Sequence, residues 1–526
     1  MHLTVGGSGQ AHEFLRERGT NHPRFPRPRR LAGFSASRAV LAAVMVCTVV
    51  PMALFYAGRF AVAGRCFWVL AGAALMGFAL MAGPELLLAF LIAVAPLINL
   101  LRSFAFFNVV IVLYAAALFL CFVRDPSRLS GLFRQFPWLG GVSALAVVFY
   151  AASFLNTGRY SSNLRVFELL FALVTILLLR ERPKLLASAL LGLVVSACTV
   201  GFAMLPHLDT TERLGMVRVD DPDVPWTASF GNPIQLGLPL SLGFLALVID
   251  GGRWLQLQTR PLWRVALLLP TTALLVLTTS RAAWLATAVG LTVSFAWGKR
   301  QRFKLLAGGL VVLAAVLAVL TSEYGDAVRR GYEHTFGEDR TLAQRSTGRS
   351  DQWTVAWRAF TSSAGSSVHG YGPGVGSEAY ARVSATMAVH GAGSQVALHS
   401  LFMQVVVETG LLGLVPLVAL LAAAGVRVFR RTAQSGIVLP WACFLGFLLV
   451  AMTVTGFDTV SGVMLGLGLT VTSKSHRTNT AARLTKPRSF PRIRAGMRSQ
   501  QRRGPAPRAK AEPANDSRQS TSRVNP

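Results

Sequence analysis

Three side chains have the types needed to bind a phosphate group and to move a proton: Arg281, Arg349 and His399. Arginine binds phosphate oxygens through paired hydrogen bonds, and histidine can act as a general base near neutral pH. Arg281 separates two apolar runs in LTTSRAAWLA, Arg349 lies in a long polar segment, and His399 stands where that segment enters an apolar run. We therefore expect chemistry on a phosphate-containing lipid at one membrane face.

Each of these residues also has a simpler interpretation. Arg281 could be an interfacial arginine whose side chain reaches the lipid headgroups, Arg349 an ordinary solvated loop residue, and His399 a residue that marks the membrane interface. Of the other loop histidines, His369 and His390 do not form the HExxH or His-x-His spacings of a zinc site. No metal centre is therefore predicted.

Glycine spacing near His399 suggests a second feature. If a helix runs unbroken from His399, Gly410 lies about 20° to one side of it around the helix axis and Gly413 about 40° to the other. Such a stripe would let a neighbouring helix or a lipid chain approach closely. Glu408 would lie on the opposite side and is not expected to orient the histidine. The glycine-rich turn at 369–376 could approach a phosphate, although a plain loop has the same composition.

A short helix is expected directly after Arg349, in SDQWTVAWRAF. Ser350 can cap this helix, and Trp353, Trp357 and Phe360 recur at helical spacing on one face. We expect that face to pack on the membrane surface, which would hold the arginine near the bilayer.

The elements that position these residues must be membrane helices. Of 526 residues, 52% are hydrophobic and only 14% are charged, and the mean hydropathy is +0.49. A soluble domain carries about 25% charged residues. Apolar runs long enough to cross about 30 Å of hydrocarbon recur, and runs of this length form helices in lipid. We predict an all-α polytopic membrane protein with about 12–14 transmembrane helices. The expected spans are 39–58, 66–82, 84–100, 105–123, 137–155, 164–179, 185–205, 231–250, 265–279, 282–298, 305–321, 401–426, 437–456 and 459–472.

Basic residues set the expected orientation, because cytoplasmic connectors are enriched in Lys and Arg. More than half of the net charge of +29 lies in two tails that lack the apolar content to fold. Attraction to anionic membrane lipids explains such tails better than nucleic-acid binding. We predict basic cytoplasmic tails at 1–38 and 473–526, membrane helices at 39–321 and 401–472, and one large extracytoplasmic loop at 322–400.

These residues resemble the O-antigen ligase and O-antigen polymerase superfamily of bacterial membrane glycosyltransferases, over about 225–460. Its most specific motif is His-Ser/Asn, nine residues, then Gly-x-x-Gly, and Ser400 stands here where asparagine is commoner. The segment FGNPIQLGLPLSL from Phe230 resembles the Gly-Asn-Pro start of a family span. The other matching residues are Ser280-Arg281-Ala282, Arg349, His399, Gly410, Gly413 and the glycines of the loop turn.

The resemblance implies a GT-C-like inverting glycosyltransferase of the bacterial inner membrane that needs no metal or cofactor. Its donor would be an undecaprenyl-diphosphate-linked glycan, and its acceptor a hydroxyl of lipid A-core or of a growing polysaccharide. His399 would act as the base, and Arg281 and Arg349 would bind the diphosphate. Ser400, Gly410 and Gly413 would contribute to substrate binding.

Several functions share this resemblance. A ligase is slightly favoured over a polysaccharide polymerase proper or a protein O-oligosaccharyltransferase. A transporter or a lipid-linked sugar flippase fits less well, because it should carry cationic groups within its spans. Here the cationic candidates gather at one face beside a large loop.

Overall fold

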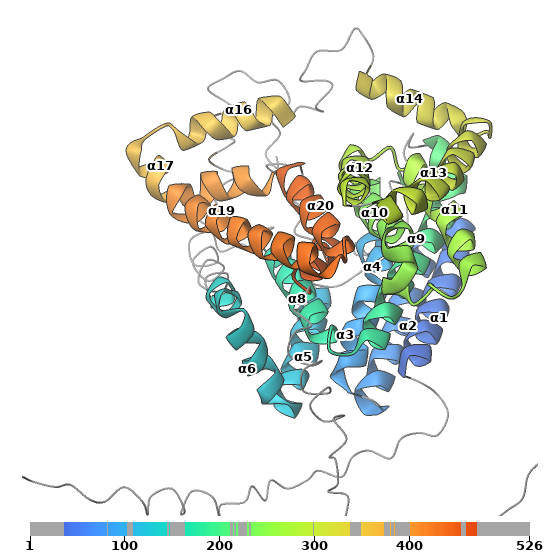
Figure 1. Ribbon diagram of the computed structural model, residues 1–526, viewed down its shortest axis with the longest axis horizontal. Coiled ribbons are helices and arrows are strands. Elements are labelled where there is room, and N and C mark those ends of the chain that lie inside the picture. The colour runs from blue at the N-terminus through green and yellow to red at the C-terminus, as the bar shows by residue number, and fades with distance from the viewer. Residues whose placement is uncertain are drawn as a thin grey trace, which may run out of the picture. The chain divides into compact units, whose positions relative to one another are not determined.

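Long apolar helices dominate the part of the chain that the computed structural model describes (Figure 1). Contacts divide the chain into two units, Met1–Ser473 and Lys474–Pro526, and all described residues belong to the first. The structure describes residues 36–81, 83–101, 109–144, 147, 164–210, 214, 217–218, 229–230, 233–297, 299–336, 349–372, 379, 383, 400–453 and 459–470.

The α-helices in chain order are α1 (Ala36–Tyr56), α2 (Phe60–Met81), α3 (Pro84–Ala93), α4 (Ala95–Leu101), α5 (Val109–Arg124), α6 (Pro126–Gln135), α8 (Leu164–Leu179), α9 (Pro183–Met204), α10 (Pro233–Val248), α11 (Pro261–Leu277), α12 (Arg281–Ala296), α13 (Lys299–Leu320), α14 (Gly325–Phe336), α16 (Arg349–Phe360), α17 (Ala364–His369), α19 (Leu401–Ser435), α20 (Leu439–Thr453) and α21 (Thr459–Leu469). Two 3-10 helices, η2 (Leu205–Thr210) and η3 (Ile249–Leu255), and an antiparallel pair of two-residue strands, β1 (Val217–Arg218) and β2 (Ser229–Phe230), complete the described elements.

Several of these helices can cross a membrane by length and composition. Among the described residues, α1, α2, α9 with its 3-10 extension, and α19 each qualify alone. The pairs α3–α4 and α5–α6 qualify as bent units, with angles of 63° and 105° at their breaks, and six further apolar helices are shorter. The protein is therefore a multi-pass helical membrane protein.

Described helices lie at every expected span, although at 137–155 only residues 137–144 and 147 are described, and these are helical. The predicted break at Gly83 and Pro84 is present, since α2 ends before it and α3 begins at Pro84. The single span expected at 84–100 is instead bent between α3 and α4. The loop expected at 322–400 contains helices α14, α16 and α17.

Proline starts several of these helices. Helices α3, α6, α9 and α11 begin at Pro84, Pro126, Pro183 and Pro261. The first turn of a helix has no intrahelical partner for its N–H groups, so proline, which lacks an N–H, fits there at no cost in hydrogen bonds.

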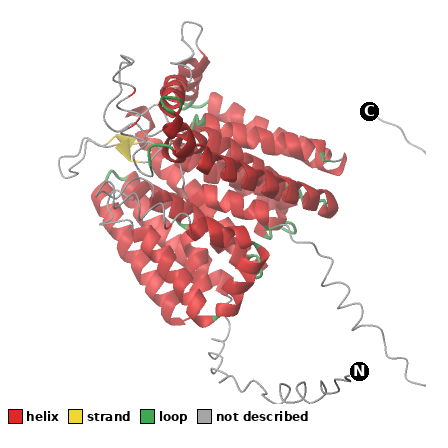
Figure 2. Cartoon of the chain, turned by 90° about the vertical axis from the view of Figure 1, so that its left-hand side faces the viewer, coloured by secondary structure: helices red, strands yellow, loops and turns green. Residues whose placement is uncertain are grey.

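Helix α9 is the most buried of the four long apolar helices, since 78% of its most apolar 18-residue segment is buried. It packs against α1, α3, α10 and α11. Small residues allow this packing. A Cβ on Gly192 would lie 2.7 Å from the Cβ of Ala93, and one on Gly243 would lie 2.7 Å from the side chain of Val194. Figure 2 shows the helices of this unit running side by side.

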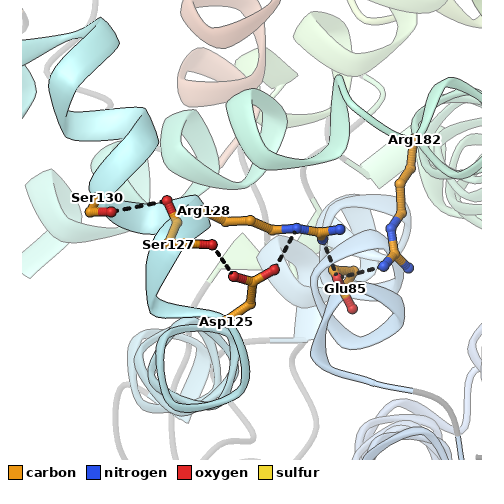
Figure 3. Close-up of polar contacts among 6 residues, drawn as sticks. All are labelled: Glu85, Asp125, Ser127, Arg128, Ser130 and Arg182. Atoms are coloured by element: carbon orange, nitrogen blue, oxygen red, sulfur yellow. Dashed lines mark hydrogen bonds and ion pairs between the residues drawn. The ribbon is translucent and has the colours of Figure 1, made fainter. Parts of the chain in front are cut away.

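The connectors at one end of these helices contact one another. Glu85, in the first turn of α3, accepts a hydrogen bond from Arg128 of α6 at 2.8 Å and lies 2.9 Å from a guanidinium nitrogen of Arg182, just before α9 (Figure 3). Arg128 also lies 3.0 Å from the carboxylate of Asp125. One carboxylate therefore joins three separate connectors.

Two further contacts extend this set to later connectors. Asp250, after α10, accepts a hydrogen bond from the backbone N–H of Leu439 at 3.3 Å. The guanidinium of Arg427, in α19, lies 5.0 Å from the ring centroid of Phe136. We call this end of the helices the connector face. These contacts agree with the prediction that the basic connectors lie on one side of the membrane. That this side is the cytoplasm stays a prediction.

Candidate active site

Arg281 is the first residue of α12, at the end of the helices away from the connector face. A tight turn joins α11 to α12, and Thr279 in that turn has a φ of 46°, which is rare for a β-branched residue. The indole of Trp284 donates to the carbonyl oxygen of Leu275 at 3.0 Å across the turn. This contact fixes where α12, and with it the half-buried Arg281, begins.

Two hydroxyl groups beside Arg281 have no hydrogen-bond partner among the described residues. They are the buried oxygens Oγ1 of Thr279 and Oγ of Ser280. Ser280 is the N-cap of α12, yet its side chain makes no capping hydrogen bond. The first N–H groups of a helix, together with a cation and free hydroxyls, can bind an anion.

Helix α10 supports the start of α12 from the side. Gly237 of α10 lies against it, because a Cβ there would be 3.0 Å from the Cβ of Ser280 and 2.9 Å from that of Ala283. Further along, the hydroxyls of Ser241 and Thr287 are 2.7 Å apart. The two helices are therefore parallel, and α10 begins at the proline of the Gly-Asn-Pro segment.

Ser400 is the N-cap of α19, and His399 directly before it lies outside the described residues. The Ser400 hydroxyl accepts a hydrogen bond from the backbone N–H of Met403 at 3.4 Å, and the residue is 3% exposed. Asparagine caps helices as well as serine does. Capping therefore explains why either residue serves at this position.

The prediction of an unbroken helix from His399 to Gly413 is wrong. Helix α19 is kinked at Gly410, where φ is 59° and ψ is −152°. The angular stripe predicted for these residues ends at the kink. Beyond it, a Cβ on Gly413 would meet the side-chain hydroxyl of Thr409 in the preceding turn.

The glycine-rich turn after α17 docks on α19 at this kink. The backbone N–H groups of Tyr371 and Gly372 donate to the carbonyl oxygens of Val407 and Glu408, at 2.9 and 3.0 Å. Gly370 also has a positive φ, 72°, and a Cβ there would be 2.5 Å from the backbone nitrogen of Thr409. The close approach expected at the glycines of α19 is therefore made by loop backbone, not by another helix.

Helix α16 begins at Arg349, so Ser350 lies in its first turn. The expectation that Ser350 caps this helix is therefore wrong. Of Arg349, only the backbone is described. Val355 and Ala356 are fully buried in a small apolar cluster with Val407 of α19. Trp357, on the face predicted to meet the membrane, is 54% exposed. Figure 1 shows α16 and α17 along α19, on the side away from α8.

Helices α12 and α19 begin at Arg281 and just after Ser400. Past the kink in α19, Phe429 approaches Trp297, the residue after α12, with ring centroids 5.7 Å apart. Helix α20 packs against both. Within the described part of the chain, no three His, Cys, Asp or Glu side chains form a group that could hold a metal ion.

Sequence reasoning missed two features of this site. Thr279 has a positive φ although neither it nor its neighbours is glycine, so no residue type indicates the strained turn. The free hydroxyl of Ser280 also depends on the tertiary structure, because a serine before a helix normally caps it.

Residues 265–418 match the family model described as O-antigen ligase. This match agrees with the resemblance of these residues to the O-antigen ligase and polymerase superfamily. It covers less than a third of the chain and includes every residue predicted for the site. No curated protein matches the chain. An O-antigen ligase domain indicates a glycosyltransferase-like enzyme of surface polysaccharide assembly that works on lipid-linked polysaccharide.

Proposed function

We propose that this O-antigen ligase family protein transfers a glycan from an undecaprenyl-diphosphate-linked donor to a hydroxyl of lipid A-core. The observation that carries the proposal is the start of α12, where Arg281 stands beside two hydroxyls that have no partner among the described residues. A diphosphate supplies the acceptor oxygens that such a site lacks. The ligase family match favours lipid A-core over the polymerase and protein acceptors.

The chemistry requires one proton transfer and one displacement. His399 takes the proton from the acceptor hydroxyl, and the acceptor oxygen attacks the anomeric carbon of the donor sugar. The bond between that carbon and the diphosphate oxygen breaks, and the diphosphate leaves with the electron pair. Direct displacement inverts the anomeric carbon. Arg281 and Arg349 stabilise the charge that develops on the leaving group.

The docked turn supports this arrangement from the loop side. It fixes the loop to the first segment of α19, directly after His399-Ser400. In this proposal Gly410 and Gly413 serve the substrate site indirectly. Gly410 allows the loop backbone to approach, and Gly413 leaves room for the Thr409 side chain.

Loss of the proposed base tests this function. A general base contributes roughly 10²–10⁴-fold, so His399→Ala should abolish nearly all glycan transfer in a host that lacks its own ligase. His390→Ala is the control, since His390 belongs to the same loop and to no motif. Membrane levels of both variants are compared by blotting. Equal transfer by the two variants would exclude His399 as the base.

The acceptor is tested in the same host. Transfer should stop when lipid A-core is truncated, whereas a polymerase would continue to lengthen polysaccharide and a protein glycosyltransferase would continue to modify protein. If the protein were a flippase, membranes that lack it but already carry the donor on the outer leaflet would still transfer glycan.

A further inference from the structure

A pocket of ≈ 630 Å³ opens at the connector face, far along the helices from the candidate active site. It lies between the starts of α1 and α9 and the connector that joins η3 to α11. Three exposed basic residues line it, and the described residues around it include no acidic side chain. The basic residues are Arg38, Lys184 and Arg260, and the apolar ones include Leu41, Leu191, Leu255 and Leu257.

Two of these cations stand at helix N-termini. Lys184 is the second residue of α9, and Arg260 is the N-cap of α11. Neither helix has a side-chain cap, so their first N–H groups add partial positive charge at the pocket. The hydroxyls of Ser37 and Thr259 also line it. Cations, helix N-termini and hydroxyl donors together suit a phosphate group.

The wall of the pocket contains a strained turn. Gln256 has a φ of 55°, in the left-handed region that residues other than glycine seldom adopt. The N–H of Leu257 donates to the carbonyl of Gly252 at 3.1 Å and holds this turn. Strained residues of this kind concentrate at ligand sites. Here the strained turn brings Leu257 and Arg260 to the same cavity.

Exposed apolar side chains continue from the pocket along the helices. On α1, Met45 and Val49 follow Leu41 at intervals of one helical turn, and they are 48% and 47% exposed. On α11, Leu262 and Trp263 come two and three residues after Arg260 and are 83% and 63% exposed. A phosphate bound at the mouth would therefore have lipid-accessible apolar surface beside it.

We propose that this pocket binds the phosphate headgroup of an anionic phospholipid from the leaflet beside the connector face. The headgroup contacts Lys184, Arg260 and Arg38, and an acyl chain lies along the exposed side chains of α1 or α11. Basic pockets between membrane helices bind anionic headgroups in this way. The continuous apolar surface favours a lipid over a free phosphate. This site is independent of the glycosyltransferase proposal.

The test measures lipid binding to the purified full-length protein by native mass spectrometry. Dioleoyl phosphatidylglycerol is titrated against dioleoyl phosphatidylcholine, and glycerol phosphate is added as a soluble competitor. The pocket variant is Lys184→Gln/Arg260→Gln. The matched control, Arg134→Gln/Arg430→Gln, removes the same charge from two exposed arginines elsewhere near the connector face.

We expect selective retention of phosphatidylglycerol by the wild type and about 30-fold weaker binding by the pocket variant, because each basic residue near an anionic surface contributes roughly fivefold. The control should change binding less than about threefold. Equal loss in both double variants would overturn the proposal, since it would show general surface attraction. Equal competition by glycerol phosphate and by lipid would overturn it as well. The single variants Lys184→Gln and Arg260→Gln, both exposed, give the same decision if the double variant is unstable.

Discussion

Gly370 and Gly410 meet backbone to backbone, because a Cβ on Gly410 would lie 2.7 Å from the backbone nitrogen of Gly370. Both residues have positive φ, so each is glycine for its conformation as well as for the contact. The contact fixes the turn after α17 to the segment of α19 that follows Ser400. A loop position and a helix position are thus parts of one junction.

Alanine at Gly410 should therefore disrupt the junction. Gly410 has a positive φ with an extended ψ, a conformation that costs a residue with a side chain about 1–3 kcal/mol, and the new methyl group would also meet the carbonyl of Val368. We expect faster proteolysis within the loop and a large loss of glycan transfer. Gly436→Ala is the control, since Gly436 has a φ of 67° but nothing within 4 Å. If both variants behaved alike, strain alone and not the junction would account for the effect.

Ser280→Ala should separate binding from stability. The Ser280 hydroxyl is buried without a partner in the described structure, so its removal should leave the unfolding temperature unchanged or raise it slightly. If that hydroxyl binds the donor, transfer should fall by about tenfold. Thermal unfolding and transfer are measured on the same preparation. Unchanged transfer would remove Ser280 from the donor site.

Lysine should replace Arg281 and Arg349 poorly. A lysine keeps the charge but loses the paired hydrogen bonds to phosphate, so Arg281→Lys and Arg349→Lys should each reduce transfer by at least about tenfold at normal membrane levels. Arg358→Lys changes an exposed arginine at the other end of α16 and should have little effect. Activity close to wild type in both site variants would show that these arginines contribute to membrane topology or packing and do not bind the donor.

Reporter fusions test the predicted orientation. A reporter that is active only outside the cytoplasm should be active when fused near Gly365 and inactive when fused near Arg430. The reverse pattern would place the connector face outside and contradict the assignment of the loop.

Glu85→Gln should destabilise the connector face. The Glu85 side chain is only 17% exposed and contacts two arginines, so loss of its charge should cost about 1–3 kcal/mol of unfolding free energy. Asp326→Asn is the control, because Asp326 and Arg329 are each 72% exposed and 3.9 Å apart, a pair whose contribution is close to zero. Thermal unfolding in detergent compares the two. Equal shifts would mean that Glu85 contributes no more than a surface pair.

The helices were predictable because each apolar run must satisfy its own backbone in lipid. Length and hydropathy therefore located α1, α9 and α19, and Gly83-Pro84 marked a helix boundary correctly. The kink at Gly410 was not predictable in the same way. A glycine is compatible with a continuous helix, and only the docked turn shows that this one adopts a positive φ.

The sequence identified candidate residues of the site, but it did not predict the local structure around them. Arg281 was identified from its position between two apolar runs, and the structure places it at a helix start. The turn before it depends on Thr279, whose residue type favours an ordinary conformation. The ion pairs of Glu85 join segments far apart in the chain, and no local pattern carries that information.

The three-way contact of Glu85 has a consequence for how the chain is made. The ribosome synthesises Glu85 first, Arg128 later and Arg182 last, so the carboxylate cannot be fully paired until the start of α9 has emerged. Until then the early helices lack Arg182, the second arginine that contacts Glu85, and they also lack α9, against which α1 and α3 pack. Insertion of α9 therefore completes the first half of the protein, and a chain truncated before Arg182 should be open to membrane proteases.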